Sequence, residues 1–274
     1  MTPRMSGADW PPEAVRRLWD WYGANPYVQG SYFTAMVGRG VAEFLSATGK
    51  LSGKALDYGC GPGHMIEQLL ERGLECLAAD SSPGSIRAVN ERYAGRKGWG
   101  GGVVSGEGRL PFPDESFDVV LCIETLEHMP EAAGAALLGE LRRVMKPGGI
   151  GLLTVPSSEP LERNFIYCPF CEAEFHKWQH CRSFDAEALE RQAAMGGFDV
   201  SFCGSLDFGA FQLAEGLPPL RDLSAARFAT WLASTRRRTL DRLLPRAFPD
   251  GRVFRHRLGG GGPHLCAVVT PRMS

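Results

Sequence analysis

A glycine cluster flanked by two acids is the segment best suited to bind a small ligand. Residues 56–63 read LDYGCGPG, and glycines let the backbone turn sharply and approach a ligand with no Cβ in the way. Asp57 lies two positions before Gly59, the first glycine, and Asp80 lies 21 positions after it. An acid at that later position accepts hydrogen bonds from both hydroxyls of a ribose. Alternatively, Asp80 only belongs to the cap of the next helix.

The spacing of this cluster separates two classes of cofactor. Dinucleotide-binding folds carry G-x-G-x-x-G, which brings a helix N-terminus to a pyrophosphate, whereas this chain has G-x-G-x-G. The Asp57 carboxylate would repel a pyrophosphate, but it suits the sulfonium and amino groups of S-adenosylmethionine (SAM). The cluster therefore favours SAM over NAD and argues against a nucleotide-dependent oxidoreductase.

Methyl transfer from SAM requires an aligned acceptor and, where the acceptor carries a proton, a base that removes it. Residues 124–128, Glu-Thr-Leu-Glu-His, follow an apolar run and supply the catalytic candidates Glu124, Glu127 and His128. His128 could act as a general base because the pKa of an imidazole lies close to neutral pH. The alternative is that this segment only starts a helix near the cofactor and packs it.

A further candidate site is rich in cysteine and histidine. Residues 168–181 read CPFCEAEFHKWQHC, and a C-x2-C pair makes a tight turn that two more nitrogen or sulfur ligands complete into a tetrahedral zinc site. We expect a structural zinc here, since a metal would order a segment that has few apolar anchors. The alternative is a loop with reduced cysteines. The candidate ligands are Cys168, Cys171, His176 and either His180 or Cys181.

The elements around these residues alternate between short apolar runs and amphipathic stretches. We expect strands at 55–58, 74–79, 103–104, 117–123 and 150–155, and helices at 64–72, 82–93 and 132–145. This alternation predicts an α/β fold with a doubly wound, Rossmann-like parallel sheet. Ligands of such sheets bind outside the carboxyl ends of the strands, where the cofactor candidates fall.

Taken together, these motifs resemble the class I SAM-dependent methyltransferases, in particular the methyltransferase type 11 group that includes the ubiquinone and menaquinone biosynthesis methyltransferases. The resemblance covers roughly residues 54–156. It rests on the glycine cluster, Asp80, the run LPFPDESFD at 110–118, the segment Glu124–His128 and KPGG at 146–149.

The resemblance implies that the glycine cluster holds the methionine part of SAM, Asp80 its ribose, and the segment before Leu110 its adenine. Family members carry an Asp shortly before the Leu-Pro-Phe run, whereas this chain has Glu107 there. The adenine contact therefore falls to Glu107 or to backbone groups. The predicted cofactor-binding residues are Asp57, Tyr58, Gly59, Cys60, Gly61, Gly63, Asp80, Ser81, Glu107 and Glu124.

The pattern Glu-x-x-Glu-His is also similar to the metal site of certain O-methyltransferases, including those of ubiquinone biosynthesis and those that modify small-RNA ends. There, two acids, a histidine and a later histidine hold a divalent ion that polarises the acceptor hydroxyl. Glu124, Glu127 and His128 match, and His180 is the candidate later histidine. A similar Cys-Pro-x-Cys…Phe-His…His insert in some methyltransferases of this group favours His180 as the fourth zinc ligand as well.

Composition sets limits on location and partners. The chain has 274 residues, with 30 Lys+Arg against 31 Asp+Glu, so a general polyanion binder is not indicated. We find no apolar run long enough to cross a membrane and no apolar core of a signal peptide, and we expect a cytoplasmic location.

We expect one core with added segments: an N-terminal helical cap at 1–50, a SAM-binding core at 51–205 that contains the zinc-binding insert at 160–183, a helical cap at 206–258, and a last core strand at 259–274. The acceptor is expected over the carboxyl edge of the sheet, between the caps and the insert. Aromatic candidates for this site are Tyr27, Tyr32, Phe33, Phe208, Phe211, Phe228 and Trp231.

The sequence thus predicts a SAM-dependent methyltransferase that acts on a small molecule, through an oxygen atom of a biosynthetic intermediate. Aromatics among arginines in the second cap suit a hydrophobic acceptor with an anionic group, although a solvated helical face explains them too. An RNA methyltransferase is an alternative, supported by the knuckle-like spacing and by Arg236–Arg238, but the neutral charge argues against nucleic acid. A non-catalytic SAM-binding protein is the third alternative.

Overall fold

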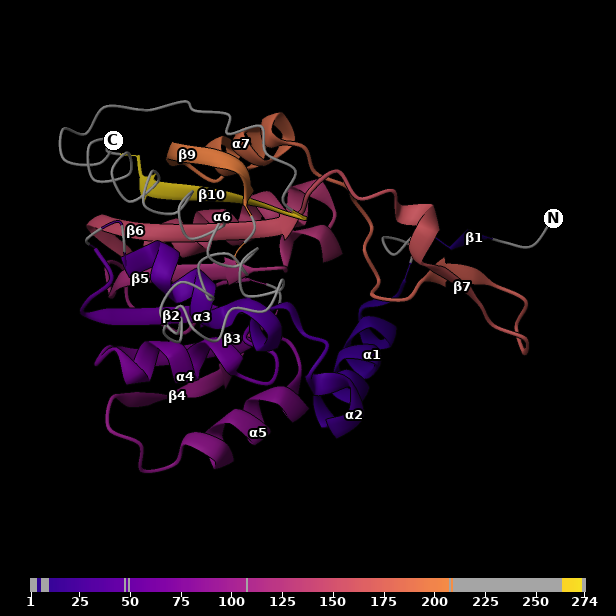
Figure 1. Ribbon diagram of the computed structural model, residues 1–274, viewed down its shortest axis with the longest axis horizontal. Coiled ribbons are helices and arrows are strands. Elements are labelled where there is room, and N and C mark those ends of the chain that lie inside the picture. The colour runs from indigo at the N-terminus through magenta and orange to yellow at the C-terminus, as the bar shows by residue number, and fades with distance from the viewer. Residues whose placement is uncertain are drawn as a thin grey trace, which may run out of the picture.

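A seven-stranded sheet forms the centre of the described part of the chain in the computed structural model (Figure 1). The structure describes residues 4–5, 10–46, 48, 50–106, 108–206, 208 and 263–272. The strands of the sheet are β2 (Lys54–Tyr58), β3 (Glu75–Asp80), β4 (Trp99–Val104), β5 (Phe117–Ile123), β6 (Met145–Pro156), β9 (Phe198–Leu206) and β10 (His264–Pro271). Their order across the sheet is β4-β3-β2-β5-β6-β10-β9.

The direction of the strands places the ligand crevice. β2 pairs in parallel with β3 on one side and β5 on the other, and β6 is parallel to β5, while β10 is antiparallel to β6 and β9. The chain therefore extends the sheet first to one side of β2 and then to the other. Ligands of doubly wound sheets bind at such a switch point, outside the carboxyl ends of the strands. The predicted Rossmann-like sheet is confirmed.

Helices cover both faces of the sheet and bury its apolar side chains (Figure 1). α3, α4 and α5 share one core cluster with the sheet, and α6 and α7 share the other. β5, with the sequence FDVVLCI, is buried along almost its whole length, as a strand covered on both faces must be. The helices are α3 (Phe33–Ser46), α4 (His64–Glu71), α5 (Pro83–Tyr93), α6 (Glu131–Val144) and α7 (Ala186–Met195).

The N-terminal helices and the insert lie together beyond the carboxyl ends of the parallel strands (Figure 1). α1 (Pro12–Ala24) and α2 (Pro26–Gln29) precede α3, and the Tyr22 hydroxyl of α1 donates to the carbonyl of Lys177 in the insert at 3.0 Å. The insert is more regular than the sequence indicated. It contains a short 3-10 helix, Leu161–Asn164, and an antiparallel hairpin of β7 (Phe165–Tyr167) and β8 (Glu174–His176), with β1 (Arg4–Met5) parallel to β8.

Two strands are longer than the sequence predicted. β4 begins at Trp99 rather than at residue 103. The sequence prediction started too late because the first half of the strand contains three glycines, which have low strand propensity. β6 begins at Met145 and runs through the Lys-Pro-Gly-Gly segment that was expected only to stop a helix. Of the predicted cap at 206–258, all but Leu206 and Phe208 lies outside the described residues. Among the helices that are described, none has the length and apolar character to span a bilayer.

Tyr93 connects α5 to the glycine cluster. Its ring is buried, and its hydroxyl donates to the Gly63 carbonyl at 2.8 Å. We expect Tyr93→Phe to lower the free energy of unfolding by about 1–3 kcal/mol, because the buried carbonyl loses its donor while the ring still fills its place. Chemical denaturation measures this. The control is Tyr27→Phe, which alters a tyrosine that is 96% exposed; equal stability of the two variants would contradict the expectation.

Candidate functional site

The glycine cluster turns sharply at the carboxyl end of β2. Gly59, Gly61 and Gly63 all have positive φ, at 72°, 48° and 84°, a region that other residues rarely adopt. A Cβ on Gly63 would lie 2.8 Å from Val89 of α5, and one on Gly59 would meet the side chain of Thr125. The sequence therefore needs glycine at these positions both for conformation and for space.

Asp80 braces this turn from the end of β3. One of its carboxylate oxygens accepts from the Gly61 amide at 2.8 Å, and the other accepts from the Ser82 amide at 2.8 Å. Burial raises the pKa of Asp80 although these hydrogen bonds favour its ionised form. The side chain that caps α5 is Ser82, which accepts from the Ser85 amide at 3.0 Å. Asp80 is thus more than a part of the helix cap.

Asp57 is a buried acid with an unsatisfied oxygen. It is 2% exposed, and its Oδ2 has no hydrogen-bond partner among the described residues. Burial, and secondarily the charge of Asp80, raises the pKa of Asp57 to about 7. Of the other predicted cofactor residues, Tyr58 and Cys60 are buried, Ser81 is exposed, and Glu107 lies outside the described residues.

The two acids of the segment after β5 have different surroundings. Glu124 has a positive φ of 47°, accepts from the Thr154 hydroxyl at 2.8 Å, and lies 3.1 Å from Nδ1 of His264. Glu127 belongs to the 3-10 helix Leu126–His128 and is 1% exposed, and neither of its oxygens has a hydrogen-bond partner within the described part of the chain. Glu124 is therefore not among the ligand atoms that gather around Glu127, although its charge still acts on Glu127.

A compact acid–histidine cluster surrounds Glu127. Two sets of ligand atoms each lie within 4.8 Å of one another: Glu127 with His128 and His180, and Glu159 with His176 and His180. His180 is shared. Oε1 of Glu127 lies 3.8 Å from Nε2 of His128 and 4.0 Å from Nε2 of His180, whereas Nδ1 of His180 contacts Glu159. The cluster joins residues that follow β5 and β6 to the insert.

The electrostatics of the cluster are uneven. Burial, followed by the charge of Glu124, raises the pKa of Glu127 well above its ordinary value, and burial, followed by His180, lowers the pKa of His128 to about 3. His128 is therefore neutral, and its contact with Glu127 is not an ion pair. At Glu159, burial opposes ionisation, but hydrogen bonds from His176 and His180 outweigh it and hold the pKa below its ordinary value. The carboxylate of Glu159 thus has hydrogen-bond donors, whereas the carboxyl group of Glu127 has none among the described residues.

Aromatic side chains of α1 cover the cluster. The Trp19 ring packs edge-on against His128 with centroids 4.7 Å apart, and Tyr22 packs on Trp178 of the insert at 5.0 Å. His128 also meets His180 edge-on at 4.8 Å. The predicted N-terminal cap thus closes the acid–histidine cluster from the side opposite the sheet.

The predicted zinc ligands do not form one group in the described structure. Cys168 and Cys171 lie in the turn of the β7–β8 hairpin, and neither belongs to the two sets of ligand atoms around His180. His176 and His180 instead turn toward Glu159. Cys181, the alternative fourth ligand, donates its thiol to the carbonyl of Glu127 at 3.3 Å. The zinc set stays a prediction.

The aromatic candidates for the acceptor site divide in a similar way. Tyr32 packs over Gly61, and the Phe33 ring packs at a tilt against His264 with centroids 4.2 Å apart and edge-on against Phe208 at 5.8 Å. Tyr27 points into solvent. Residues 211, 228 and 231, like Arg236–Arg238, lie outside the described residues.

Glu159 and His264 are the residues that the sequence analysis missed. Glu159 follows the carboxyl end of β6, and the same strand-end argument that selected Asp80 could have found it. His264 starts β10 and pairs in register with Pro156 at the end of β6. Nothing local in the sequence indicates that it meets Glu124, 140 residues away.

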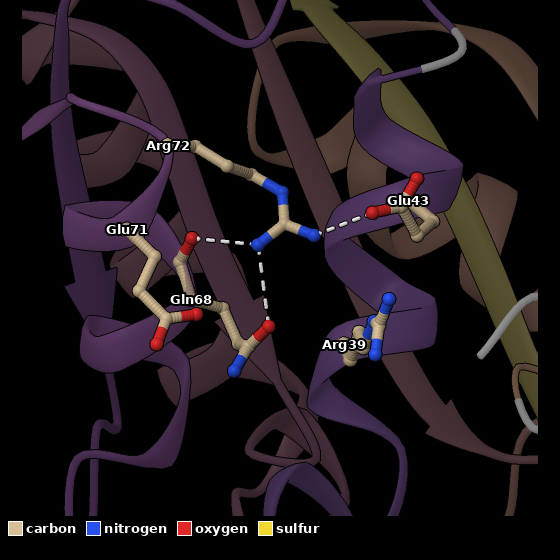
Figure 2. A pocket seen from close by; sticks show the side chains of 5 residues that line it. All are labelled: Arg39, Glu43, Gln68, Glu71 and Arg72. Atoms are coloured by element: carbon tan, nitrogen blue, oxygen red, sulfur yellow. Dashed lines mark hydrogen bonds and ion pairs between the residues drawn. The ribbon is translucent and has the colours of Figure 1, made fainter. Parts of the chain in front are cut away.

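A charged hollow lies elsewhere on the molecule, between α3 and α4 (Figure 2). Arg72 donates to Glu43 at 2.5 Å and to the carbonyl and side chain of Gln68 at 2.9 and 3.2 Å. α4 starts at the carboxyl edge of the sheet, and Arg72 caps its far end. The hollow is therefore remote from the glycine cluster, and its positive and negative side chains offset one another.

The fold and the glycine turn are those seen in class I SAM-dependent methyltransferase domains. Residues 56–153 match the sequence model of a methyltransferase domain family. The ubiquinone biosynthesis O-methyltransferase of Methylococcus capsulatus is 34% identical over 115 residues, which cover 39% of this chain and 45% of that protein. An uncharacterized methyltransferase of Mycobacterium marinum is 32% identical over 113 residues, which cover 40% of this chain and 43% of that protein.

Solved structures extend the similarity in fold. A SAM-dependent methyltransferase from Clostridium acetobutylicum superposes with a TM-score of 0.57 at 10% identity, covering 95% of this chain and 100% of that chain. In sequence, the chain spans less than half the length of the two relatives above. The central part of this chain, residues 56–153, thus matches a methyltransferase domain, and Glu127 and His128 of the acid–histidine cluster lie within the matched residues.

The hairpin cysteines allow a direct test of the predicted zinc set. We expect the predicted zinc to protect Cys168 and Cys171 from iodoacetamide in the native protein until EDTA removes the metal, although the hairpin turn that holds them is accessible. Mass spectrometry of peptides identifies the labelled thiols. Labelling of Cys168 and Cys171 to the same extent with and without EDTA would contradict the Cys/His zinc site.

Proposed function

We propose that this protein transfers the methyl group of SAM to an oxygen atom of a small-molecule acceptor, with a divalent ion at the acid–histidine cluster. The observation that carries the proposal is the position of Glu127. A fully buried carboxylate without a partner lies beyond the end of β5, beside the strand that leads into the glycine turn. The cofactor site and a candidate acceptor site thus adjoin at the switch point of the sheet.

The SAM half of the proposal rests on the glycine turn. Its backbone can approach the methionine part of the cofactor, and Asp80 holds this turn while lying where a ribose is expected. The unsatisfied Oδ2 of Asp57 favours a cationic ligand, since a nearby positive charge would stabilise the ionised form of this buried acid. Sulfonium and ammonium are the two cationic groups of SAM.

The ion half rests on the donor set of Glu127, His128 and His180. A buried carboxylate that lacks hydrogen bonds is costly unless a cation compensates it, and the imidazoles of His128 and His180 supply nitrogen ligands beside it. Two imidazoles and one carboxylate suit divalent transition metals, and three protein ligands leave room for an acceptor. When bound, the ion would polarise an acceptor hydroxyl and ease its deprotonation.

Transfer to oxygen is the finer part of the proposal. It is supported by this donor set and by the name of the Methylococcus capsulatus relative, an O-methyltransferase. An acceptor that is hydrophobic or anionic, a cytoplasmic location and a structural zinc at the hairpin cysteines stay predictions. His128 is covered by Trp19 and is better placed to hold the ion than to act as a free base.

SAM binding should depend on the ionisation of Asp57. Its pKa of about 7 in the absence of ligand means that this carboxyl is protonated in acid solution. A cationic ligand lowers that pKa, so the affinity for SAM should rise with pH up to about 7 and then level off, by as much as about tenfold per unit well below 7. Calorimetry at pH 5.5 to 8.5 measures this rise.

Asp57→Asn is the control, because it removes the titrating group and should flatten this profile. NAD serves as the competing ligand in the same titrations. Binding of NAD with no measurable affinity for SAM would overturn the methyltransferase assignment. A wild-type profile that does not differ from that of Asp57→Asn would remove only the role of Asp57.

The ion should be required for methyl transfer. We expect Glu127→Gln to weaken Zn²⁺ binding by more than the roughly 10–100-fold that outer-shell changes cost, because it removes a ligand charge. With catechol as the probe acceptor, methyl transfer from labelled SAM should fall in parallel, while SAM affinity stays unchanged. Glu187→Gln, at an exposed position of α7, is the matched control. Equal Zn²⁺ affinity and activity in Glu127→Gln and wild type would exclude the ion site.

A further inference from the structure

Glu159 occupies the side of His180 that faces away from Glu127. One of its oxygens contacts Nδ1 of His180. The other lies 3.3 Å from Nε2 of His176 and accepts from the side-chain amide of Asn164 at 2.7 Å. Nε2 of His180 is directed to the opposite side, 4.0 Å from Oε1 of Glu127. His180 therefore lies between two carboxylates, one at each ring nitrogen.

A single ion cannot bind both nitrogens of one imidazole, so it must take one side of His180. On the Glu159 side the groups already satisfy one another through hydrogen bonds. On the other side, both oxygens of Glu127 are buried without a hydrogen-bond partner among the described residues. Unsatisfied polar groups are costly and need a partner, which assigns the ion to the Nε2 side.

The hydrogen bonds of His176 define the role of Glu159 further. Nδ1 of His176 accepts from the backbone amides of His180 and Trp178, at 3.1 and 3.3 Å, so this nitrogen carries no proton. The proton of the neutral ring is then on Nε2, which donates to Glu159. A carboxylate accepts only, and Nδ1 of His180 must likewise donate to it. Glu159 thereby holds the Nδ1 proton of His180, so that the free lone pair of the neutral ring lies on Nε2.

We propose that Glu159 is the positioning residue of the ion site, which fixes the orientation and tautomer of His180 so that Nε2 is free to bind a divalent ion together with Glu127 and His128. This inference rests on the ion site of the proposed function. A ligand histidine that donates its other nitrogen to a carboxylate is a recurrent arrangement in metal sites. Here the carboxylate of Glu159 comes from the loop after β6, and His180 comes from the insert. The contact of Glu159 with His180 therefore also connects the insert to the sheet.

The competing assignment makes Glu159 a ligand itself, with His176 and His180. That arrangement would break the contact of Glu159 with Nδ1 of His180 and leave Glu127 buried without compensation. Under that assignment, Glu127→Gln would leave the affinity for the ion nearly unchanged, and Glu159→Gln would lower it strongly. The two assignments therefore predict opposite orders of effect for the same pair of variants.

The test compares Zn²⁺ affinity, by titration against a competing chelator, in wild type, Glu159→Gln and Glu162→Gln. The glutamine amide can accept from one histidine but cannot accept from the other, so Glu159→Gln should bind Zn²⁺ about 10–100-fold more weakly. Glu162 is an exposed acid three residues along the same segment, and its change should leave the affinity unaltered. The loss in Glu159→Gln should stay smaller than that in Glu127→Gln.

A second measurement separates positioning from mere structural support, and its first part uses wild type alone, so it does not need the variant to fold. Long-range ¹⁵N spectra of the imidazoles in metal-free wild type should show His180 protonated on Nδ1. In Glu159→Gln the proton should shift toward Nε2, and Co²⁺ bound to the variant should give an altered visible spectrum.

Three results would overturn the inference. These are His180 protonated on Nε2 in metal-free wild type, Zn²⁺ affinity of Glu159→Gln equal to wild type, or a larger loss in Glu159→Gln than in Glu127→Gln. If wild type binds SAM but no Zn²⁺, the ion site and this inference both fail while the SAM assignment stands. If the ion site is intact and only the Glu159 variant behaves as wild type, this inference alone fails.

Discussion

The common direction of neighbouring strands is the constraint on which the rest of the structure depends. Because β2, β3, β5 and β6 are parallel, their carboxyl ends reach one edge of the sheet, and the residues that follow each strand become neighbours. Asp80, Glu127 and Glu159 are far apart in the chain, yet each follows a different strand at this edge. The fold is stabilised by the apolar side chains on the two helix-covered faces of the sheet, so the carboxyl edge can carry polar groups.

Burial of charge without compensation is the second feature of this edge. Asp57 and Glu127 both have oxygens that lack partners, and burial raises the pKa of each. A stable fold rarely keeps such groups unless a ligand compensates them, and clusters of shifted pKa values are typical of functional sites. Asp80 and Glu159, in contrast, are satisfied by hydrogen bonds, and each holds a neighbouring element in place. At the glycine turn, the hydrogen-bonded Asp80 therefore accompanies the unsatisfied Asp57. At the acid–histidine cluster, the hydrogen-bonded Glu159 accompanies the unsatisfied Glu127.

The insert and α1 complete the site without belonging to the sheet. His180 of the insert reaches the cluster, and Trp19 and Tyr22 of α1 pack against it and against Trp178. Groups of the cluster are consequently shielded from water, and electrostatic interactions within it are stronger than at the surface. The accessible hairpin turn with Cys168 is the part of the insert that lies furthest from this shielding.

The sequence alone determined the sheet class, most element bounds and the glycine turn, because these follow from local periodicity and from backbone conformations that only glycine readily adopts. It also selected Asp57, Glu127 and His128. Which residues meet was decided by the tertiary structure. The sequence grouped His180 with the nearby cysteines and, through the family resemblance, also with Glu124, Glu127 and His128, whereas the fold places it between Glu127 and Glu159. Residues distant along the chain become neighbours only when packing orients their elements, and spacing within one segment carries no information about that orientation.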